Sequence, residues 1–301
     1  MTKFFGERCN LENYVNIPDN IVLVDDRNFE HTMVEQQGTI IYSDNYQHWN
    51  SSSISQVYFP RYLLEILANP ETKTYDFQQQ RNYLLSCHNR NPRLHRIKLY
   101  FKLREQIWFS KCQVSFSNVS DKDSFLITDT LNELKNILTP DEIDQVLSYS
   151  KTTIAQPGDK PTDGWGYTTN FSPAHGSCYV DLVTESSTTL PLITEKTWKP
   201  LLSGQLFFIL GPYGIIDHLR KTGIDVYDDI VDHSYDFEQD LDKKIEMLLN
   251  SINKIKDDLP NIWKNSTSRR LANCQLISSP EYREHLLKDV YDKINKLTIL
   301  D

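Results

Sequence analysis

The sequence lacks most of the features that mark common classes of protein. Its five cysteines are spread along 301 residues without a Cys-x-x-Cys pair, which is typical of reduced thiols and not of a disulfide framework or a zinc site. No apolar run is long enough to cross a bilayer. The first residues also lack the sustained apolar stretch of a secretory signal peptide. These absences predict a cytoplasmic protein with no membrane span.

Glycine-based nucleotide motifs are missing as well. The chain has ten glycines, and none falls in a Gly-x-Gly-x-x-Gly or Gly-x-x-x-x-Gly-Lys pattern. The Gly-x-Ser-x-Gly of serine hydrolases and the His-Glu-x-x-His of zinc peptidases are also absent. A phosphate site in this chain would therefore depend on charged side chains and helix termini. No residue is assigned to a metal, and no cofactor is expected.

Charge of one sign is in excess but unevenly placed. The chain has 41 acidic and 32 basic residues, a net charge of −9, which disfavours nucleic acid as a partner. Residues 81–104 nevertheless contain several Lys and Arg and no Asp or Glu, whereas residues 225–242 show the reverse. We therefore expect a local anion site within an acidic protein, and a solvated acidic face at 225–242.

Short apolar stretches alternate with helical patterns along the chain, which predicts an α/β fold. The predicted strands are 20–26, 38–44, 83–89, 112–117, 177–185 and 206–210. Helices are predicted at 58–70, 92–106, 129–138, 140–149, 194–203 and 212–222, with further helices towards the C-terminus. The alternation from 83 to 250 favours an open parallel sheet of Rossmann type. We expect an N-terminal α/β domain (1–80), a Rossmann-like domain (81–277), and a C-terminal helix (278–301) that packs back on the first.

The helix predicted at 194–203 begins with an adjacent acidic and basic residue. Thr194 is a suitable N-cap, which places Glu195 and Lys196 in the first turn. The N–H groups and dipole of a helix N-terminus favour phosphate, and a carboxylate there can hold the hydroxyls of a ribose. Glu185, which ends the preceding strand, is a second candidate for sugar hydroxyls. The alternative interpretation is a capped helix with a solvated Glu–Lys pair and a loop-capping Glu185.

Arginines gather between residues 87 and 96. Arg90 lies at a strand–helix turn, and Arg93 and Arg96 follow on the first helical turns, where residues three apart are neighbours. Arginine binds phosphate oxygens in a bidentate way, so three arginines without nearby carboxylates favour an anion. A solvated basic helix face is the alternative.

These stretches carry a family resemblance. TES (184–186), followed by ITEKTWKPLLSGQLFFILGP (193–212), resembles the donor-binding half of fucosyltransferase-type GT-B glycosyltransferases. The stretch NRNPRLHRIKLYFKL, together with EKTWKP and GPYGIIDHLRKTGID, resembles glycosyltransferase-like proteins of phages and marine bacteria. The likeness covers about residues 80–240. It implies a GT-B-like fold, with two Rossmann-type domains and a cleft between them. It also implies a metal-independent, inverting transfer of a sugar from a GDP- or UDP-linked donor to a carbohydrate or other hydroxyl acceptor.

The resemblance also implies roles for residues. Glu195 would contact the ribose, Lys196 the diphosphate and Glu185 the donor sugar, while Arg90 or Arg96 would hold the diphosphate. Ser186 stands where the family has Asn. The expected donor-binding set is Arg90, Arg93, Arg96, Glu185, Thr194, Glu195, Lys196 and Lys199.

An inverting enzyme must also remove a proton from the acceptor hydroxyl. The strand-end carboxylates Asp25, Asp26 and Asp44 are the candidate bases, with Asp44 favoured because aromatic and amide side chains follow it. A turn aspartate is the alternative for Asp44. Three other functions remain open: a phage-type enzyme that glycosylates modified DNA bases, an inactive nucleotide-sugar or glycan-binding protein, and a nucleotide-binding regulatory module.

Overall fold

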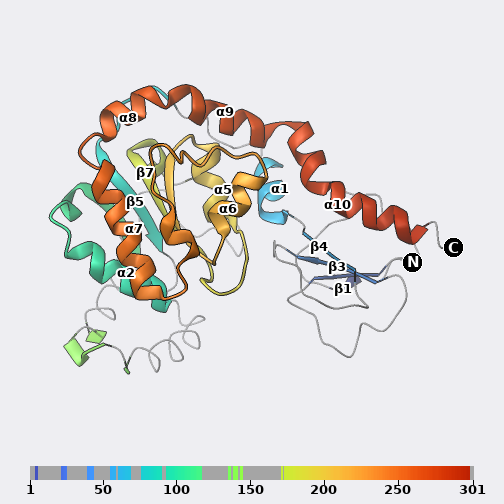
Figure 1. Cartoon of the computed structure of the whole chain (residues 1–301), viewed down its shortest axis with the longest axis horizontal. Coiled ribbons are helices and arrows are strands. Elements are labelled where there is room, and N and C mark those ends of the chain that lie inside the picture. Colours follow the sequence, from blue (N-terminus) through green and yellow to red (C-terminus); the bar gives the residue numbers. More distant parts are fainter. Residues whose placement is uncertain are drawn as a thin grey trace.

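The computed structural model describes most of the C-terminal two thirds of the chain and short segments before it (Figure 1). The described residues are 4–5, 22–25, 39–43, 55–58, 60–68, 76–89, 93–116, 135–136, 138–141, 143–144, 171 and 173–298.

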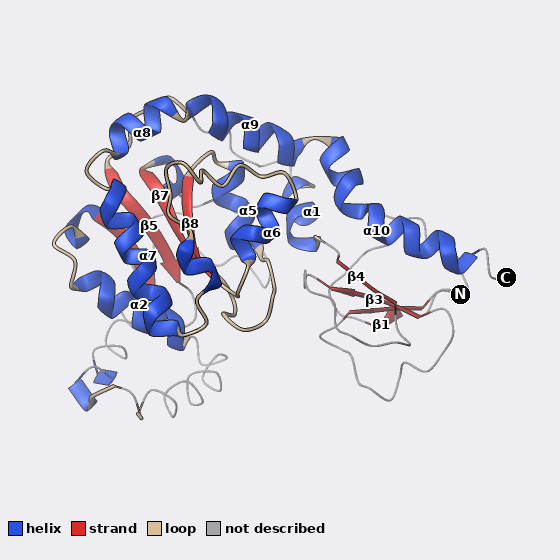
Figure 2. Ribbon diagram, in the orientation of Figure 1, coloured by secondary structure: helices blue, strands red, loops and turns tan. Residues whose placement is uncertain are grey.

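Residues after 80 build a four-stranded parallel sheet in the order β6-β5-β7-β8. Figure 2 labels β5, β7 and β8. The strands are β5 (Tyr83–Asn89), β6 (Cys112–Phe116), β7 (Cys178–Thr184) and β8 (Leu206–Leu210). Every position of β7 and β8 is buried, as expected for strands covered on both faces. The open parallel sheet predicted from the sequence is confirmed, and β5 and β8 have the predicted bounds.

Helices cover both faces of this sheet. The connections β5–α2–β6 and β7–α5–β8 run in opposite directions across the sheet, so right-handed crossovers put α2 and α5 on opposite faces. Helix α7 lies beside α2, and α9 lies beside α5. The helices are α2 (Leu94–Arg104), α5 (Glu195–Leu202), α6 (Ile215–Lys221), α7 (Leu241–Ile255), α8 (Leu259–Asn265), α9 (Thr267–Ser278) and α10 (Pro280–Thr298), with short 3-10 turns η4 (Phe109–Lys111), η6 (Pro173–Gly176) and η7 (Ser234–Phe237).

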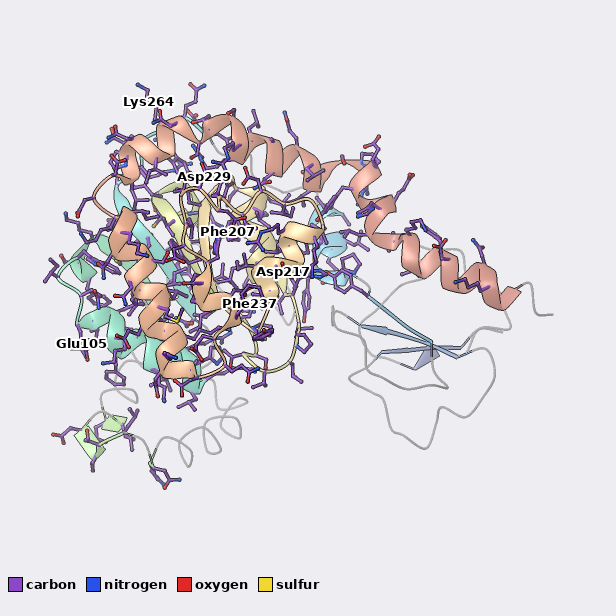
Figure 3. The ribbon with its side chains drawn as sticks, in the orientation of Figure 1. Glu105, Phe207, Asp217, Asp229, Phe237 and Lys264 are labelled. Carbon is purple, nitrogen blue, oxygen red and sulfur yellow. The ribbon has the colours of Figure 1, made fainter. Side chains whose placement is uncertain are left out.

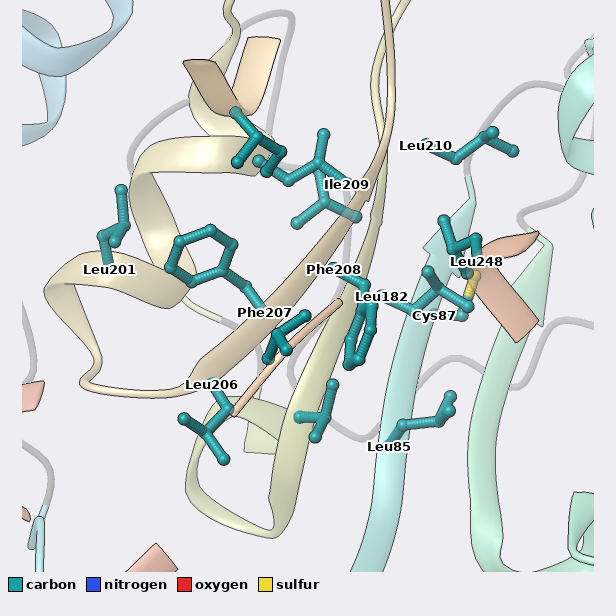
Figure 4. Packing of buried hydrophobic residues seen from close by; sticks show 14 of the residues in the cluster. Leu85, Cys87, Leu182, Leu201, Leu206, Phe207, Phe208, Ile209, Leu210 and Leu248 are labelled. Atoms are coloured by element: carbon teal, nitrogen blue, oxygen red, sulfur yellow. The ribbon is translucent and has the colours of Figure 1, made fainter. Parts of the chain in front are cut away.

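The core lies between the sheet and these helices. Figure 4 shows side chains of β7 and β8, among them Leu182 and Phe208, packed together with Leu248 of α7. Gly204, between α5 and β8, has a φ of +66°, and the ring of Phe77 occupies the space that a Cβ there would need. This close approach explains why a glycine ends the α5 segment.

Further strands precede residue 60 and form a second parallel sheet in the order β1-β2-β3-β4. They are β1 (Phe4–Phe5), β2 (Val22–Asp25), β3 (Thr39–Ser43) and β4 (Ser55–Tyr58). The predictions for β2 and β3 are confirmed, but β4 was not predicted. Because β4 continues to Tyr58, the helix expected at 58–70 is the shorter α1 (Arg61–Leu67).

Contacts connect the early elements with later ones. Helix α1 lies against α5, and α10 lies beside β4. The domain bounds and the cleft expected between two domains stay predictions, and the helices expected at 129–138 and 140–149 fall largely outside the described residues. Within the described segments, no helix combines the length and apolarity that a bilayer span requires.

Candidate anion site at the switch point of the sheet

The candidate site lies beyond the carboxyl ends of β5 and β7. From β5 the chain moves to β6, and from β7 it moves to β8 on the other side, so the strand order reverses between β5 and β7. In open α/β sheets, ligands bind beyond the strand ends at this reversal. Thr184, the last residue of β7, donates its hydroxyl to Asn89 Oδ1 of β5 at 2.5 Å. Glu185 follows β7 directly, and the other predicted donor-binding residues in the described structure lie at or near the starts of the helices that follow these two strands.

The carboxylate of Glu185 holds the N-terminus of α5. Its side chain is completely buried. Glu185 Oε1 accepts hydrogen bonds from Thr194 N at 3.0 Å and from Thr197 Oγ1 at 2.6 Å. Glu185 Oε2 accepts from Thr194 Oγ1 at 2.6 Å and from Ser186 N at 3.1 Å. Four donors saturate this carboxylate, so it fixes the loop between β7 and α5 to the first turn of α5.

Thr194 is the N-cap of α5, as predicted: its side chain accepts from Lys196 N at 3.5 Å. The Lys196 ammonium contacts Glu195 Oε1 at 2.7 Å, Thr194 Oγ1 at 3.2 Å and Ser186 Oγ at 3.3 Å. Burial raises the pKa of Glu195, but the charges of Lys196 and Lys199 outweigh that effect, so the net shift is downward. Glu195 and Lys196 therefore form a half-buried ion pair in the first turn of α5, not the solvated pair of the alternative interpretation.

Arginines at the start of α2 reach the same loop from the other face of the sheet: Arg93 is the N-cap of the helix and Arg96 lies in its first turn. Arg93 Nη1 donates to the carbonyl oxygen of Ser186. Arg96 is almost fully buried, and its Nη2 donates to the carbonyl oxygens of Thr184 and Glu185, each at 3.2 Å. Burial and the charge of Arg93 lower the pKa of Arg96 to about 10, so it stays protonated at neutral pH. The alternative of a solvated basic face does not describe Arg96.

His95 completes the contact between α2 and the loop. Its Nε2 lies 2.9 Å from the carbonyl oxygen of Glu185, and because a carbonyl only accepts, Nε2 carries the proton. Burial and the charge of Arg96 lower the pKa of His95 to about 3, so the ring is neutral at physiological pH. The sequence did not mark His95, Ser186 or Thr197 as site residues. Thr197 lies three residues after the N-cap Thr194, so both hydroxyls face the start of the helix. That spacing was the signal in the sequence that could have identified Thr197.

The charges brought together do not cancel. Arg93, Arg96, Lys196 and Lys199 are basic, whereas Glu185 and Glu195 are acidic, and His95 is neutral. The formal charges of these six described residues therefore sum to two positive charges at the switch point of a protein whose net charge is −9. Such a half-buried excess attracts an anion far more strongly than the protein as a whole does.

The structure therefore brings most of the predicted donor-binding residues to one place. Arg93, Arg96, Glu185, Thr194, Glu195 and Lys196 share the loop between β7 and α5, and Lys199 lies one turn further along α5. Arg90, Asp26 and Asp44 lie outside the described residues. Contact of any of these residues with a ligand stays a prediction.

The acidic segment 225–242 is not simply a solvated face. Arg269 forms ion pairs with Asp225 and Asp229, and Arg220 and Lys254 pair with Asp228 and Asp232. The counterions come from α6, α7 and α9, and their positions in the sequence did not reveal this pairing. Among the residues with described placement, no cluster of three or more His, Cys, Asp or Glu side chains could hold a metal ion.

Comparisons with known proteins add little to this geometry. No protein-family model and no curated protein matches the chain. Among solved structures, the chain is similar to the DNA modifying enzyme beta-glucosyltransferase, studied with and without its substrate uridine diphosphoglucose. The match has 12% sequence identity and a TM-score of 0.37, and it covers 89% of this chain and 73% of that one. A TM-score of this size does not establish a shared fold, so the function is inferred from the residues of the site.

Proposed function

We propose that this chain is a glycosyltransferase that binds the diphosphate of a nucleotide-sugar donor at the switch point between β5 and β7. One observation carries the proposal. Arg93, the N-cap residue of α2, contacts the carbonyl oxygen of Ser186, and Lys196 of α5 contacts the hydroxyl of the same residue. Cations from two helices on opposite faces of the sheet therefore meet beyond its carboxyl edge. The family resemblance supports a sugar donor over other phosphate ligands.

The chemistry of the donor explains what these groups would do. When the bond between the sugar and the phosphate breaks, the electron pair moves onto the diphosphate, which gains negative charge. Arg93, Lys196 and the N-terminus of α5 would stabilise this charge without moving, because the bonds to Ser186, Thr194 and Glu185 already hold them. The acceptor hydroxyl loses its proton to a carboxylate, for which Asp25, Asp26 and Asp44 stay the predicted candidates.

Glu185 takes a structural role in this proposal. All four of its hydrogen bonds go to α5 or to the adjoining loop. A direct contact with the donor sugar would require one of those donors to be exchanged. Glu195 keeps its proposed role at the ribose, since its side chain is 15% exposed and ionised beside Lys196.

Binding of nucleoside diphosphates tests the site. Isothermal titration with GDP, UDP and ADP should give saturable binding by at least one of them. Lys196→Ala should weaken this binding about ten- to a hundredfold, the equivalent of one lost charge-assisted hydrogen bond. Lys264→Ala, which removes an exposed lysine of α8 (labelled in Figure 3), is the matched control and should bind as wild type does. If no nucleoside diphosphate binds at millimolar concentration, the proposal is wrong.

Turnover separates an enzyme from a binder. Donor hydrolysis, and transfer to a panel of saccharides and of duplex DNA with hydroxymethylated bases, should be detected with wild type and reduced in Lys196→Ala and Glu195→Ala. Binding without hydrolysis or transfer would identify an inactive nucleotide-sugar-binding protein. Transfer to DNA alone would identify the base-modifying alternative.

A further inference from the structure

Two aromatic side chains are exposed beyond the carboxyl ends of the parallel strands. Tyr213, between β8 and α6, is 44% exposed, and Phe237, the last residue of η7, is 51% exposed. Their ring centroids are 5.5 Å apart and their planes are 73° apart, an edge-to-face pair. Phe237 is labelled in Figure 3. Adjoining exposed apolar side chains mark interaction sites more often than isolated ones do.

This aromatic pair adjoins the anion site through the loop that follows β8. Glu185 N donates to the carbonyl oxygen of Leu210 at 3.0 Å. A Cβ on Gly211 would lie 3.4 Å from Glu185 Cγ, so the loop packs directly on the residue that holds α5. Tyr213 is two residues further along, and its Cα therefore lies within about 7 Å of that of Gly211. The pair and the cations of the switch point thus border one stretch of the carboxyl edge.

Buried polar contacts hold the two aromatic residues in place. Lys244, 4% exposed, donates to the carbonyl oxygen of Gly211 at 2.9 Å. The Asp236 carboxylate accepts from Ile216 N at 3.2 Å and from Asp217 N at 3.1 Å, and its carbonyl oxygen accepts from Gly214 N at 3.2 Å. These bonds tie the loop that bears Tyr213 to η7, which bears Phe237. The backbone segments that carry the two aromatic residues are therefore fixed relative to each other.

We infer that Tyr213 and Phe237 form an aromatic platform for the base of the nucleotide whose diphosphate binds at the switch point: the base stacks on the face of one ring, and the other ring, nearly perpendicular to it, supports that ring. This inference rests on the proposed function. A diphosphate held by Arg93 and Lys196 leaves its nucleoside to extend along the carboxyl edge, on which Gly211 packs against Glu185 and Tyr213 follows two residues later. Stacking accepts any base, because every base has a π face, and it contributes on the order of ten- to a hundredfold in affinity. The continuity with the anion site favours a nucleotide over a protein partner.

Pyrophosphate and nucleoside diphosphates distinguish the two parts of the site. Dissociation constants should be measured by titration calorimetry for pyrophosphate, GDP, UDP and GDP-linked and UDP-linked sugars. Phe237→Leu and Tyr213→Ala should raise the Kd of the nucleoside diphosphates about tenfold and leave that of pyrophosphate unchanged. Lys196→Ala should weaken both ligands. Ile107→Ala, at a side chain that is 95% exposed elsewhere on the surface, is the control and should change neither.

Each other outcome is decisive. If wild type binds neither pyrophosphate nor any nucleoside diphosphate, the proposed function itself fails. If wild type binds both and the aromatic variants bind as tightly, the platform is wrong while the anion site stands. Equal weakening of pyrophosphate and nucleoside diphosphates would also overturn the platform, and so would weakening confined to the nucleotide sugars. Both side chains are exposed, so circular dichroism spectra of the variants should match that of wild type.

Discussion

Replacing Glu185 with glutamine tests the central structural feature of the site. In Glu185→Gln, one carboxylate oxygen becomes an NH2 group, which cannot accept a hydrogen bond. Each oxygen accepts from one backbone N–H and one threonine hydroxyl. Whichever oxygen is replaced, the threonine hydroxyl that donated to it can rotate and accept a hydrogen bond from the new NH2 group. The backbone N–H that donated to the same oxygen cannot accept, so it loses its partner.

The magnitude follows from this geometry. A buried donor without an acceptor costs about 1–3 kcal/mol, and the two remaining bonds weaken because charge-assisted bonds are roughly twice as strong as neutral ones. We therefore expect the free energy of unfolding to fall by about 3 kcal/mol. Thr197→Val removes a single donor and should cost about 1–2 kcal/mol. The double variant should show a coupling energy of at least about 0.5 kcal/mol, since the two residues are in direct contact.

Urea unfolding, followed by tryptophan fluorescence and circular dichroism, measures these changes. Glu246→Gln, on the exposed side of α7, is the control and should stay within about 0.5 kcal/mol of wild type. A loss in Glu185→Gln no larger than that of the control would refute the reasoning, because it would mean that the carboxylate does not hold α5.

Three further perturbations have defined outcomes. The pKa of His95 is about 3, below its ordinary 6.5, so the unfolded chain binds more protons between these values and stability falls as the pH drops through them. His95→Gln should reduce the change in the free energy of unfolding by up to about 1.4 kcal/mol per pH unit, as measured by urea unfolding at successive pH values. An unchanged slope would show that the His95 ring is not both buried and neutral in the folded protein. Lys244→Met leaves Asp236 buried without its neighbouring cation and should lower the free energy of unfolding by about 3 kcal/mol. Lys243→Met, at an exposed lysine, is the control and should lower the free energy of unfolding by less than about 1 kcal/mol. Equal losses in the two variants would count against the buried electrostatic interaction between Lys244 and Asp236. Gly204→Ala should lower the melting temperature well beyond Gly214→Ala, although both glycines have positive φ, because only Gly204 has a ring in the Cβ space; similar losses would contradict that packing.

Helix α2 shows where sequence reasoning reaches its limit. Leu94, Ile97 and Phe101 recur at helical spacing, but only Ile97 is fully buried, and Arg96 is buried as well. An arginine there looked solvated or ligand-bound because the sequence shows no carboxylate beside it. Its partners are instead the carbonyl oxygens at the end of β7, which become available only when parallel strands end together.

The sequence by itself determined the local features: the strands and most helices in the described residues after 80, the Thr194 cap and the parallel character of the sheet. These depend on periodicity, capping and chain alternation within short stretches. Only the tertiary structure decided that the strand order reverses between β5 and β7, that Ser186 receives cations from two helices, and that the Glu185 carboxylate is saturated. Those features arise from contacts between segments far apart in the chain, and no short stretch of sequence encodes which carbonyl or hydroxyl a distant side chain will meet.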